Sequence, residues 1–340
     1  MSSPTHVLTY RLSDLEICQI DSLLTALVQG DHDPAAPDFH DRLWRHVAEL
    51  PIGLREFLAE FRTRETAAAC KVTGLPVDDE RVGPTPLHWT EAAKSEAARR
   101  EEFYLSLLSG CLGEVFGWPT LQEGRLIQNV LPMPGEETQQ SGHSSDVLLA
   151  WHTEDGFHPY RCDYLGLFGV RNHDRVPTTL ASVRDIDLDE GARDILHQQR
   201  FTILPDDEHL RQLRRTAPDS PALLRLQRMR DEPQPVAVLF GAEDDPYLRI
   251  DPYFMPQLSG DDEAARALRL LTAELDRVQS DVVVEAGSLL FVDNYRAVHG
   301  RKAFASRYDG TDRWLKKTVS TRDLRKSRDM RGEAAARQLT

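Results

Sequence analysis

The sequence predicts an α+β fold in which helices surround a β-sandwich or β-barrel core. Three observations support this fold class. The first third of the chain places apolar residues at helical spacing, and short β-rich runs separated by Gly, Pro, Asp and Asn follow from about residue 120. Two further helical patterns, at residues 187–199 and 261–279, interrupt these runs. This arrangement differs from regular βαβ winding, and no fixed-period repeat indicates a solenoid or a propeller.

The N-terminal part, residues 1–118, is predicted to be mainly helical. Ser13 followed by Glu16 forms a capping-box signature, and the helical pattern of apolar residues then continues to Gly30. The same spacing recurs over residues 54–61, and the longest candidate helix covers residues 91–116. We expect these apolar stripes to pack in the core.

The β-rich part is predicted to form the core of one domain. We expect residues 1–340 to be this single domain, with the core at residues 119–325. The charged, Ala-rich tail from residue 322 onward is expected to be a solvated helix or a frayed end. The expected strands are 125–130, 147–151, 164–170, 178–183, 235–240, 247–250, 282–285, 288–293 and 314–321.

Composition excludes several classes of protein. The chain carries 41 Lys and Arg against 55 Asp and Glu, a formal net charge of −14. This balance argues against a partner that is a nucleic acid or an anionic membrane surface. No stretch has the roughly 18 consecutive apolar residues of a membrane span, and the first residues lack a secretory signal. Four widely spaced cysteines exclude a zinc ribbon, and we expect a cytoplasmic protein.

The sharpest candidate for chemistry is a metal site. His152 and Glu154 are two residues apart, so on an extended segment both point to the same face while Thr153 points away. A third ligand must come from another strand, and His299 follows the strong strand 288–293. Two histidines and one carboxylate form a facial triad that leaves three metal positions open. Such a site suits non-haem Fe(II) that binds both a co-substrate and O₂.

Arg313 adds a candidate anion site to this triad. It lies fourteen residues after His299, and the turn at residues 308–310 allows the two to sit on adjacent antiparallel strands. An arginine in that place can hold a carboxylate through two parallel hydrogen bonds. The order of these residues along the chain is more specific than any of them alone.

These motifs resemble the Fe(II)/2-oxoglutarate-dependent oxygenases of the clavaminate synthase-like and TauD-like group. The resemblance runs from about residue 70 to 325 and rests on the 151–155 and 299–301 segments together with Arg313. Segments 155–164 and 308–316 are similar to the arginine hydroxylases of antibiotic biosynthesis, including those of the viomycin and streptothricin (streptolidine) pathways.

The resemblance implies a distorted double-stranded β-helix (jelly roll) with flanking helices, and Fe(II), 2-oxoglutarate and O₂ as cofactor and co-substrates. His152, Glu154 and His299 would hold the iron. Arg313 would bind the distal carboxylate of 2-oxoglutarate, helped by the hydroxyl of Thr179.

The resemblance also implies a substrate site for free L-arginine. Lys317 would bind the substrate carboxylate and Glu154 its ammonium group, while Asp251 would bind the guanidinium. A lid near residues 205–230 would close over the substrate through Asp206 and Glu208. Two departures affect substrate positioning. Tyr253 stands where a relative has a second acid, and Leu121 replaces an amide side chain, with Gln122 adjacent as the candidate contact.

The predicted reaction is hydroxylation of free L-arginine at C3, followed by C4 to give 3,4-dihydroxyarginine. Glu154 occupies the position that a halogenase leaves open for chloride, which favours hydroxylation. Three alternatives remain at this point. They are a mono-hydroxylase of arginine or another amino acid, a cupin-like metal hydrolase or isomerase that has no use for Arg313, and a jelly-roll binding protein without catalysis.

Overall fold

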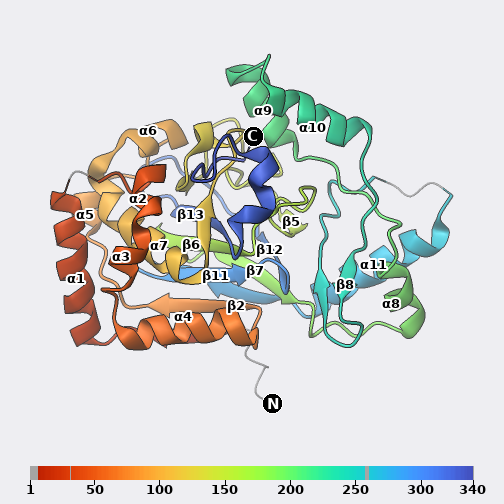
Figure 1. The fold of residues 1–340 in the computed structure, drawn as a ribbon, viewed down its shortest axis with the longest axis horizontal. Helices are drawn as coiled ribbons and strands as arrows, with labels where there is room; N and C mark the ends of the chain where they lie inside the picture. Colours follow the sequence, from red (N-terminus) through yellow and green to blue (C-terminus); the bar gives the residue numbers. More distant parts are fainter. Residues whose placement is uncertain (1–6, 31, 257–259, 340) are drawn as a thin grey trace.

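Two β-sheets face each other and form the centre of the protein, and helices cover their outer faces (Figure 1). The computed structural model describes residues 7–30, 32–256 and 260–339. Apolar side chains from both sheets meet between them, among them Leu165, Leu290 and Leu315 of the large sheet and Leu180 of the small one. This two-sheet arrangement agrees with the predicted jelly roll.

The large sheet has seven strands in the order β1-β2-β11-β6-β13-β3, and β4 also pairs with β13. Its inner strands β11, β6 and β13 are antiparallel and almost entirely buried, whereas the edge pair β1–β2 is parallel. The strand bounds are β1 Val7–Arg11, β2 Ala69–Thr73, β3 Glu114–Phe116, β4 Gln128–Val130, β6 Tyr164–Arg171, β11 Leu289–Asp293 and β13 Trp314–Thr321.

The small sheet has four strands in the order β10-β7-β12-β5, and all of its pairs are antiparallel. A separate hairpin, β8–β9, lies beside it. The strand bounds are β5 Leu149–His152, β7 Pro177–Ser182, β8 Leu239–Gly241, β9 Pro246–Leu248, β10 Ser280–Val283 and β12 Ala297–Arg301. For eight of the nine predicted strands, both ends lie within three residues of an observed strand in one of the two sheets or the hairpin. The ninth, β8, begins four residues later than predicted.

Helices flank the sandwich on both sides. α7 packs against β13 and β6 on the outer face of the large sheet, and α1 and α4 pack on α7. α11 and α8 cover the small sheet on the opposite side. The helix bounds are α1 Asp14–Gln29, α2 Pro37–Asp41, α3 Leu43–Val47, α4 Ile52–Arg64, α5 Asp79–Val82, α6 Trp89–Lys94, α7 Arg99–Leu112, α8 Glu190–Leu196, α9 Asp207–Thr216, α10 Pro221–Asp231 and α11 Asp262–Arg277. Short 3₁₀ turns are η1 Glu96–Ala98, η2 Gln122–Gly124 and η3 Leu324–Met330.

The N-terminal part contains more sheet than its pattern predicts. The helix predicted at 91–116 is divided, because α6 ends at Lys94 and α7 ends at Leu112, and β3 follows. Gly113 marks the second break, where a Cβ would lie 2.4 Å from the carbonyl oxygen of Thr321 on the neighbouring strand. In addition, β1 and β2 extend the large sheet from a region expected to be helical.

The C-terminal tail is attached to the body of the protein. Arg337 is 7% exposed and pairs with Asp41 (3.1 Å) and Glu114 (2.7 Å), and Leu339 is also buried. The tail therefore begins with the largely exposed 3₁₀ helix η3, in line with the expected solvated helix, whereas its last described residues are held by these contacts and are not a frayed end.

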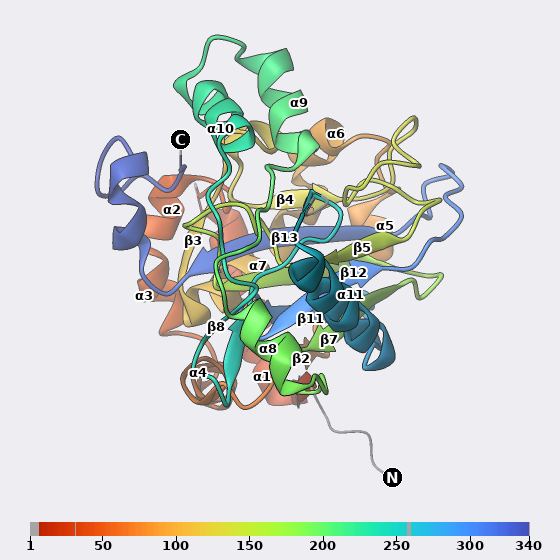
Figure 2. The same cartoon turned by 90° about the vertical axis from the view of Figure 1, so that its right-hand side faces the viewer.

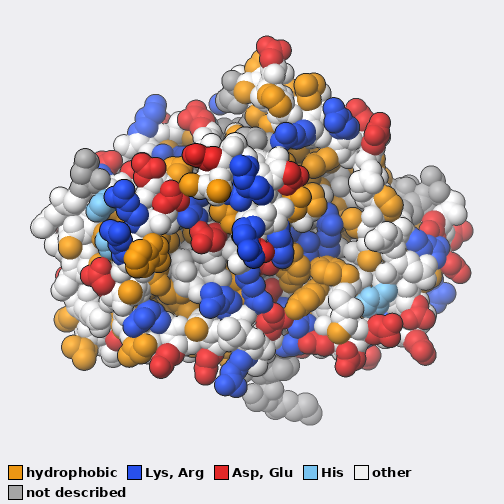
Figure 3. All heavy atoms as spheres, viewed as in Figure 1, with side chains coloured by type: hydrophobic (Ala, Val, Ile, Leu, Met, Phe, Trp, Pro, Cys, Tyr) orange, Lys and Arg blue, Asp and Glu red, His pale blue; other side chains and the backbone are white. Residues whose placement is uncertain are grey.

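The region predicted as a lid contains α9 and α10, which project from the sandwich (Figure 2). On the face drawn in Figure 3, basic and acidic side chains are interspersed, so the negative net charge produces no uniform acidic surface there. Among the described helices, none combines the length and apolar character needed to span a membrane.

Candidate active site

The predicted triad meets at the inner face of the small sheet. His152 of β5 lies directly opposite His299 of β12, and the centroids of the two imidazole rings are 4.1 Å apart. Glu154 follows β5, and its Oε2 lies 3.4 Å from Nε2 of His299. One ligand atom from each of the three side chains falls within 4.8 Å of the others. The donor set is therefore already gathered around one point where a metal ion can bind.

Local structure explains why His152 and Glu154 share a face. Thr153 points away, as expected, and its amide N–H (2.8 Å) and its hydroxyl (3.0 Å) both donate to the carbonyl of Ile250. Asp155, next along the chain, has a φ of +51°, which turns the main chain away directly after Glu154.

The protonation states at the triad suit a metal ligand set. Burial and the neighbouring His299 lower the pKa of His152 to about 3, so its imidazole is neutral at pH 7. Nδ1 of His152 lies 2.9 Å from the carbonyl of Ala150, which places the proton on Nδ1 and leaves Nε2 as the ligand atom. Burial alone would raise the pKa of Glu154, but Lys317 and the two histidines lower it well below its ordinary value. Glu154 is thus a carboxylate.

Arg313 lies at one end of the same pocket with no acid to balance its charge. It is 7% exposed, and among the described residues its Nε has no hydrogen-bond partner, while its Nη2 donates to the hydroxyl of Thr178 at 3.4 Å. Burial and the adjacent Arg301 lower the pKa of Arg313 to about 9. Within the described part of the chain, no carboxylate forms an ion pair with either arginine. A buried guanidinium of this kind fits a carboxylate ligand.

Thr178 takes the place that was predicted for Thr179. Thr178 lines the pocket beside Arg313, whereas Thr179 does not. Side chains alternate along β7, and Leu180 points into the space between the sheets, so Thr178 shares that face and Thr179 is on the other one. The geometry therefore favours Thr178 over Thr179 as the threonine beside Arg313, and contact of either with 2-oxoglutarate stays a prediction. Alternation counted from Leu180 indicates Thr178, but alternation counted from the apolar Ala181 and Val183 indicates Thr179, so the sequence pattern alone does not choose between them.

The opposite end of the pocket is acidic. Burial, followed by the charge of Asp206, raises the pKa of Asp251 to about 8, and burial raises that of Asp206 to about 6. Asp206 also caps α9 by accepting from the amide N–H of Glu208 (2.8 Å). No Lys or Arg of the described residues pairs with Asp206 or Asp251. Two partly buried acids without a cation form a site that fits a positively charged group.

Glu208 differs from these two acids because its charge is already paired. The guanidinium of Arg211 donates to Glu208 and to both carboxylate oxygens of Glu136, the latter at 2.5 and 2.8 Å. Arg211 therefore connects α9 to the loop between β4 and β5. Gln212 donates to the other oxygen of Glu208 at 2.6 Å. Glu208 lines the pocket, and its predicted contact with substrate stays a prediction.

Lys317 and Gln122 complete the predicted set. The ammonium of Lys317 lines the pocket and donates to Oε1 of Glu154, so it lies beside the triad. Gln122 lines the pocket, but its carboxamide exchanges two hydrogen bonds with the main chain of Asn129 (2.8 and 2.9 Å). Its predicted role in binding substrate stays a prediction. Tyr253 is 59% exposed, at the edge of the pocket.

The lid helix has a polar contact that the sequence pattern did not indicate. His209 of α9 is 2% exposed at its side chain, and its Nε2 lies 3.1 Å from Oδ1 of Asp155. Its Nδ1 lies 2.5 Å from the hydroxyl of Thr120, and Trp118 donates to Oδ2 of Asp155 at 2.6 Å. These contacts fasten α9 to the segment that follows Glu154.

Comparison with known families decides the classification. The family profile described as "Taurine catabolism dioxygenase TauD, TfdA family" matches residues 101–319. The chain belongs to the TauD/TfdA dioxygenase family. The predicted family, fold class and enzyme class are confirmed by this match together with the relatives below.

Relatives of this TauD/TfdA protein extend over nearly its whole length. It is 41% identical over 341 residues to an enduracididine beta-hydroxylase of Streptomyces hygroscopicus, which covers 98% of this chain and 100% of the relative. An L-ornithine/L-arginine 3-hydroxylase of Catenulispora acidiphila is 39% identical over 325 residues, covering 92% and 95%.

Solved structures of the non-heme iron oxygenase OrfP share the fold of this TauD/TfdA protein. The complex of OrfP with Fe, succinate and (3S)-hydroxy-L-Arg has a TM-score of 0.91 at 40% identity, covering 98% of this chain and 99% of OrfP. The complex with Fe and alpha-ketoglutaric acid has a TM-score of 0.87 at 39% identity and covers 98% and 100%.

Proposed function

We propose that this dioxygenase uses Fe(II), 2-oxoglutarate and O₂ to hydroxylate free L-arginine at C3. One observation carries the proposal. A single pocket holds an open His-Glu-His triad, an unpaired arginine at one end and two unpaired acids at the other. The named activities of the two relatives support it, since the β-carbon and C3 of an amino acid are the same atom.

The metal end of the pocket is assigned by charge and ligand type. His152, Glu154 and His299 are the residues that would hold Fe(II), and bound iron with 2-oxoglutarate supplies the O₂ chemistry that oxidises a C–H bond. Arg313 binds the distal carboxylate of 2-oxoglutarate, with Thr178 donating its hydroxyl. The complex of OrfP with Fe and alpha-ketoglutaric acid supports iron and 2-oxoglutarate as the two bound components.

The chain's own residues then orient the amino acid. Lys317 offers an ammonium group next to the triad for the substrate carboxylate, and Glu154 can accept from the substrate ammonium. Asp251 and Asp206 bind the guanidinium, and its charge restores their ionised forms. A substrate fixed at both ends keeps its C3 near the triad, and helix α9, which lines the pocket, excludes water from that space.

A second hydroxylation at C4 is also supported. A complex of OrfP with Fe, succinate and (3R,4R)-dihydroxy-L-Arg has a TM-score of 0.89 with this chain. Here Tyr253, exposed at the rim, adds no acid to the guanidinium end, so the distal clamp rests on Asp251 and Asp206. We propose that 3-hydroxyarginine shifts by about one carbon and presents C4.

One experiment tests the function directly. O₂ consumption and succinate release are measured with Fe(II), 2-oxoglutarate and a panel of arginine, citrulline, ornithine, homoarginine and enduracididine, followed by mass spectrometry. We expect arginine to couple succinate release to the gain of one oxygen atom, and long incubations to add a second. Turnover without 2-oxoglutarate would favour a metal hydrolase or isomerase. Preference for enduracididine over arginine would reassign the substrate, and the gain of one oxygen at most would overturn the C4 step.

For the C4 step, Tyr253→Asp restores an acid at the rim of the pocket. We expect this variant to accumulate the singly hydroxylated product. If Tyr253→Asp forms the doubly hydroxylated product as efficiently as wild type, the absence of an acid at position 253 is not the cause of the second hydroxylation.

A further inference from the structure

The carboxamide of Asn294 is bound to the main chain of Glu154. β5 ends at His152, so Glu154 lies beyond the last residue of β5 that pairs with β12. The amide N–H of Glu154 donates to Oδ1 of Asn294 at 2.7 Å, and Nδ2 of Asn294 donates to the carbonyl of Glu154 at 3.0 Å. Asn294 is fully buried, and its Nδ2 also donates to the carbonyl of Cys162 at 3.0 Å.

We propose that Asn294 is a positioning residue that sets the place of the Glu154 carboxylate in the triad. The two histidines are placed by the pairing of β5 with β12, which Glu154 lacks. The side chain of Asn294 substitutes for a neighbouring strand, because it satisfies the donor and the acceptor of the same residue. The inference rests on the proposed function, in which Glu154 is a metal ligand.

Asn294 can act in this way because its own loop is anchored. This loop joins β11 to β12, and the amide N–H of Asn294 donates to the carbonyl of Asp163 at 2.9 Å. On one side of it, the carboxylate of Asp293 accepts from the amide of Tyr295 at 2.9 Å.

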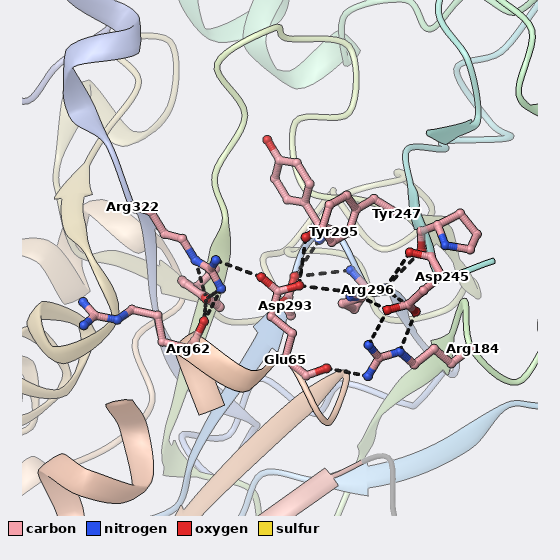
Figure 4. A network of polar contacts seen from close by, with 11 residues as sticks. Arg62, Glu65, Arg184, Asp245, Tyr247, Asp293, Tyr295, Arg296 and Arg322 are labelled. Atoms are coloured by element: carbon pink, nitrogen blue, oxygen red, sulfur yellow. Dashed lines mark hydrogen bonds and ion pairs between the residues drawn. The ribbon is translucent and has the colours of Figure 1, made fainter. Parts of the chain in front are cut away.

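On the other side, the buried Arg296 ties the loop to two other parts of the chain (Figure 4). Its guanidinium donates to both oxygens of Asp245, at 2.7 and 3.0 Å, and to Glu65 at 3.0 Å. Arg184 shares Asp245 and Arg322 shares Glu65, so five charged side chains form one network. The loop is thereby fixed against α4 and the β8–β9 hairpin, and Asn294 transmits that position to Glu154.

The consequence is a specific dependence of metal binding on Asn294. Without its carboxamide, the N–H and C=O of Glu154 lose their partners, and the carboxylate can leave the geometry shared with His152 and His299. Residues that orient metal ligands from outside typically contribute roughly 10- to 100-fold in metal affinity. A purely structural asparagine would instead change thermal stability alone.

The chain offers a matched control in Asn172. Asn172 is 5% exposed and also makes three side-chain bonds to main chain, donating to Val176 (3.0 Å) and Val284 (3.1 Å) and accepting from Val176 (2.9 Å). It lies in the turn between β6 and β7 and does not line the active-site pocket. Asn172→Ala thus removes the same chemistry from a site without a ligand role.

The test compares Asn294→Ala with Asn172→Ala. Anaerobic titration calorimetry gives the Kd for Fe(II), the visible spectrum of the Co(II)-substituted protein reports coordination, and Tm reports stability. We expect similar losses of Tm, a Kd raised about 10- to 100-fold with an altered Co(II) spectrum for Asn294→Ala, and a Kd within twofold of wild type for Asn172→Ala.

Two results would overturn the inference. One is a Kd and a Co(II) spectrum for Asn294→Ala that match wild type, and the other is equal weakening by Asn172→Ala. If an alanine variant does not fold, the milder pair Asn294→Ser and Asn172→Ser replaces it. If neither Asn294 variant folds while the Asn172 variants do, Asn294 has a structural role. Wild-type protein that binds no Fe(II) would instead contradict the proposed function.

Discussion

Lys317 donates to Oε1 of Glu154, while the other oxygen, Oε2, lies 3.4 Å from Nε2 of His299. The two oxygens of one carboxylate therefore face different partners, a cation on one side and a triad histidine on the other. In the proposed function, Glu154 would thus contribute both to the metal site and to the neighbouring site for the amino acid.

Replacing Glu154 by Ala should abolish turnover and weaken Fe(II) binding while the protein stays folded. An open site has three protein ligands, so the loss of one removes a large share of the metal affinity. Calorimetry with Fe(II) and circular dichroism measure the two effects, and His152→Ala and His299→Ala should behave alike. Activity of Glu154→Ala within twofold of wild type would remove the triad assignment.

Replacing Arg313 by Ala should raise the KM for 2-oxoglutarate about 30- to 1000-fold, with a smaller effect on arginine. A charge-assisted bidentate pair in a partly dry pocket contributes about 2–4 kcal/mol. Steady-state kinetics with each substrate varied in turn measure this. Arg171→Ala is the control, because that arginine is equally buried but paired with Asp79 outside the pocket. Equal weakening for both substrates would make Arg313 structural.

The neighbouring threonines of β7 give a test of which face holds the co-substrate. Thr178→Val should raise the KM for 2-oxoglutarate about 10- to 150-fold, because one hydrogen bond to a charged group contributes about 1.5–3 kcal/mol, and Thr179→Val should leave it unchanged. Both variants conserve volume, so each is the control for the other. A larger effect at Thr179 would show that the hydroxyl of Thr178 does not reach the ligand.

Asp251 should determine the preference for a charged substrate. Asp251→Asn should reduce kcat/KM for arginine far more than for citrulline, because a guanidinium left without its carboxylate in a buried site costs several kcal/mol. Kinetics with both amino acids measure the ratio. If both substrates lose affinity equally, Asp251 supports the loop through its bond to Phe254 instead.

The raised pKa of Asp251, about 8 through burial and then Asp206, also predicts a pH dependence. Below pH 8 the empty pocket holds a proton that arginine must displace, so arginine affinity should rise with pH to about 8 and then level off. The slope is at most tenfold per pH unit for one proton. The ratio of kcat/KM for arginine to that for citrulline, measured as a function of pH, isolates this effect. In Asp251→Asn this ratio should no longer depend on pH. A ratio that falls with rising pH would contradict it.

The same proton affects folding with the opposite sign. The folded protein binds it more tightly than the unfolded chain, whose Asp has a pKa of 3.8, so this group's contribution to stability is lost as pH rises from about 4 to 8. Asp251→Asn should therefore increase Tm more at pH 8 than at pH 5, as calorimetry can measure.

The sequence by itself determined the features that depend on neighbours along the chain. Helix α1 begins after Ser13 and ends before Gly30 as the capping box and the spacing predict, because a cap acts within one turn. The i, i+2 spacing likewise determined that His152 and Glu154 share a face, because alternation is a property of extended backbone.

Tertiary structure decided the features whose partners lie far away. Strand β2 forms because it can pair with β11, and β1 then pairs with β2 at the edge of the sheet. The helix predicted at 91–116 ends at Leu112, where Gly113 meets Thr321. Thr178 was chosen over Thr179 by the face of β7 that points between the sheets. Asn294 lies 140 residues from Glu154, and only the packing of the two sheets brings its carboxamide to that main chain, since hydrogen bonds between distant segments leave no periodic signal in a sequence.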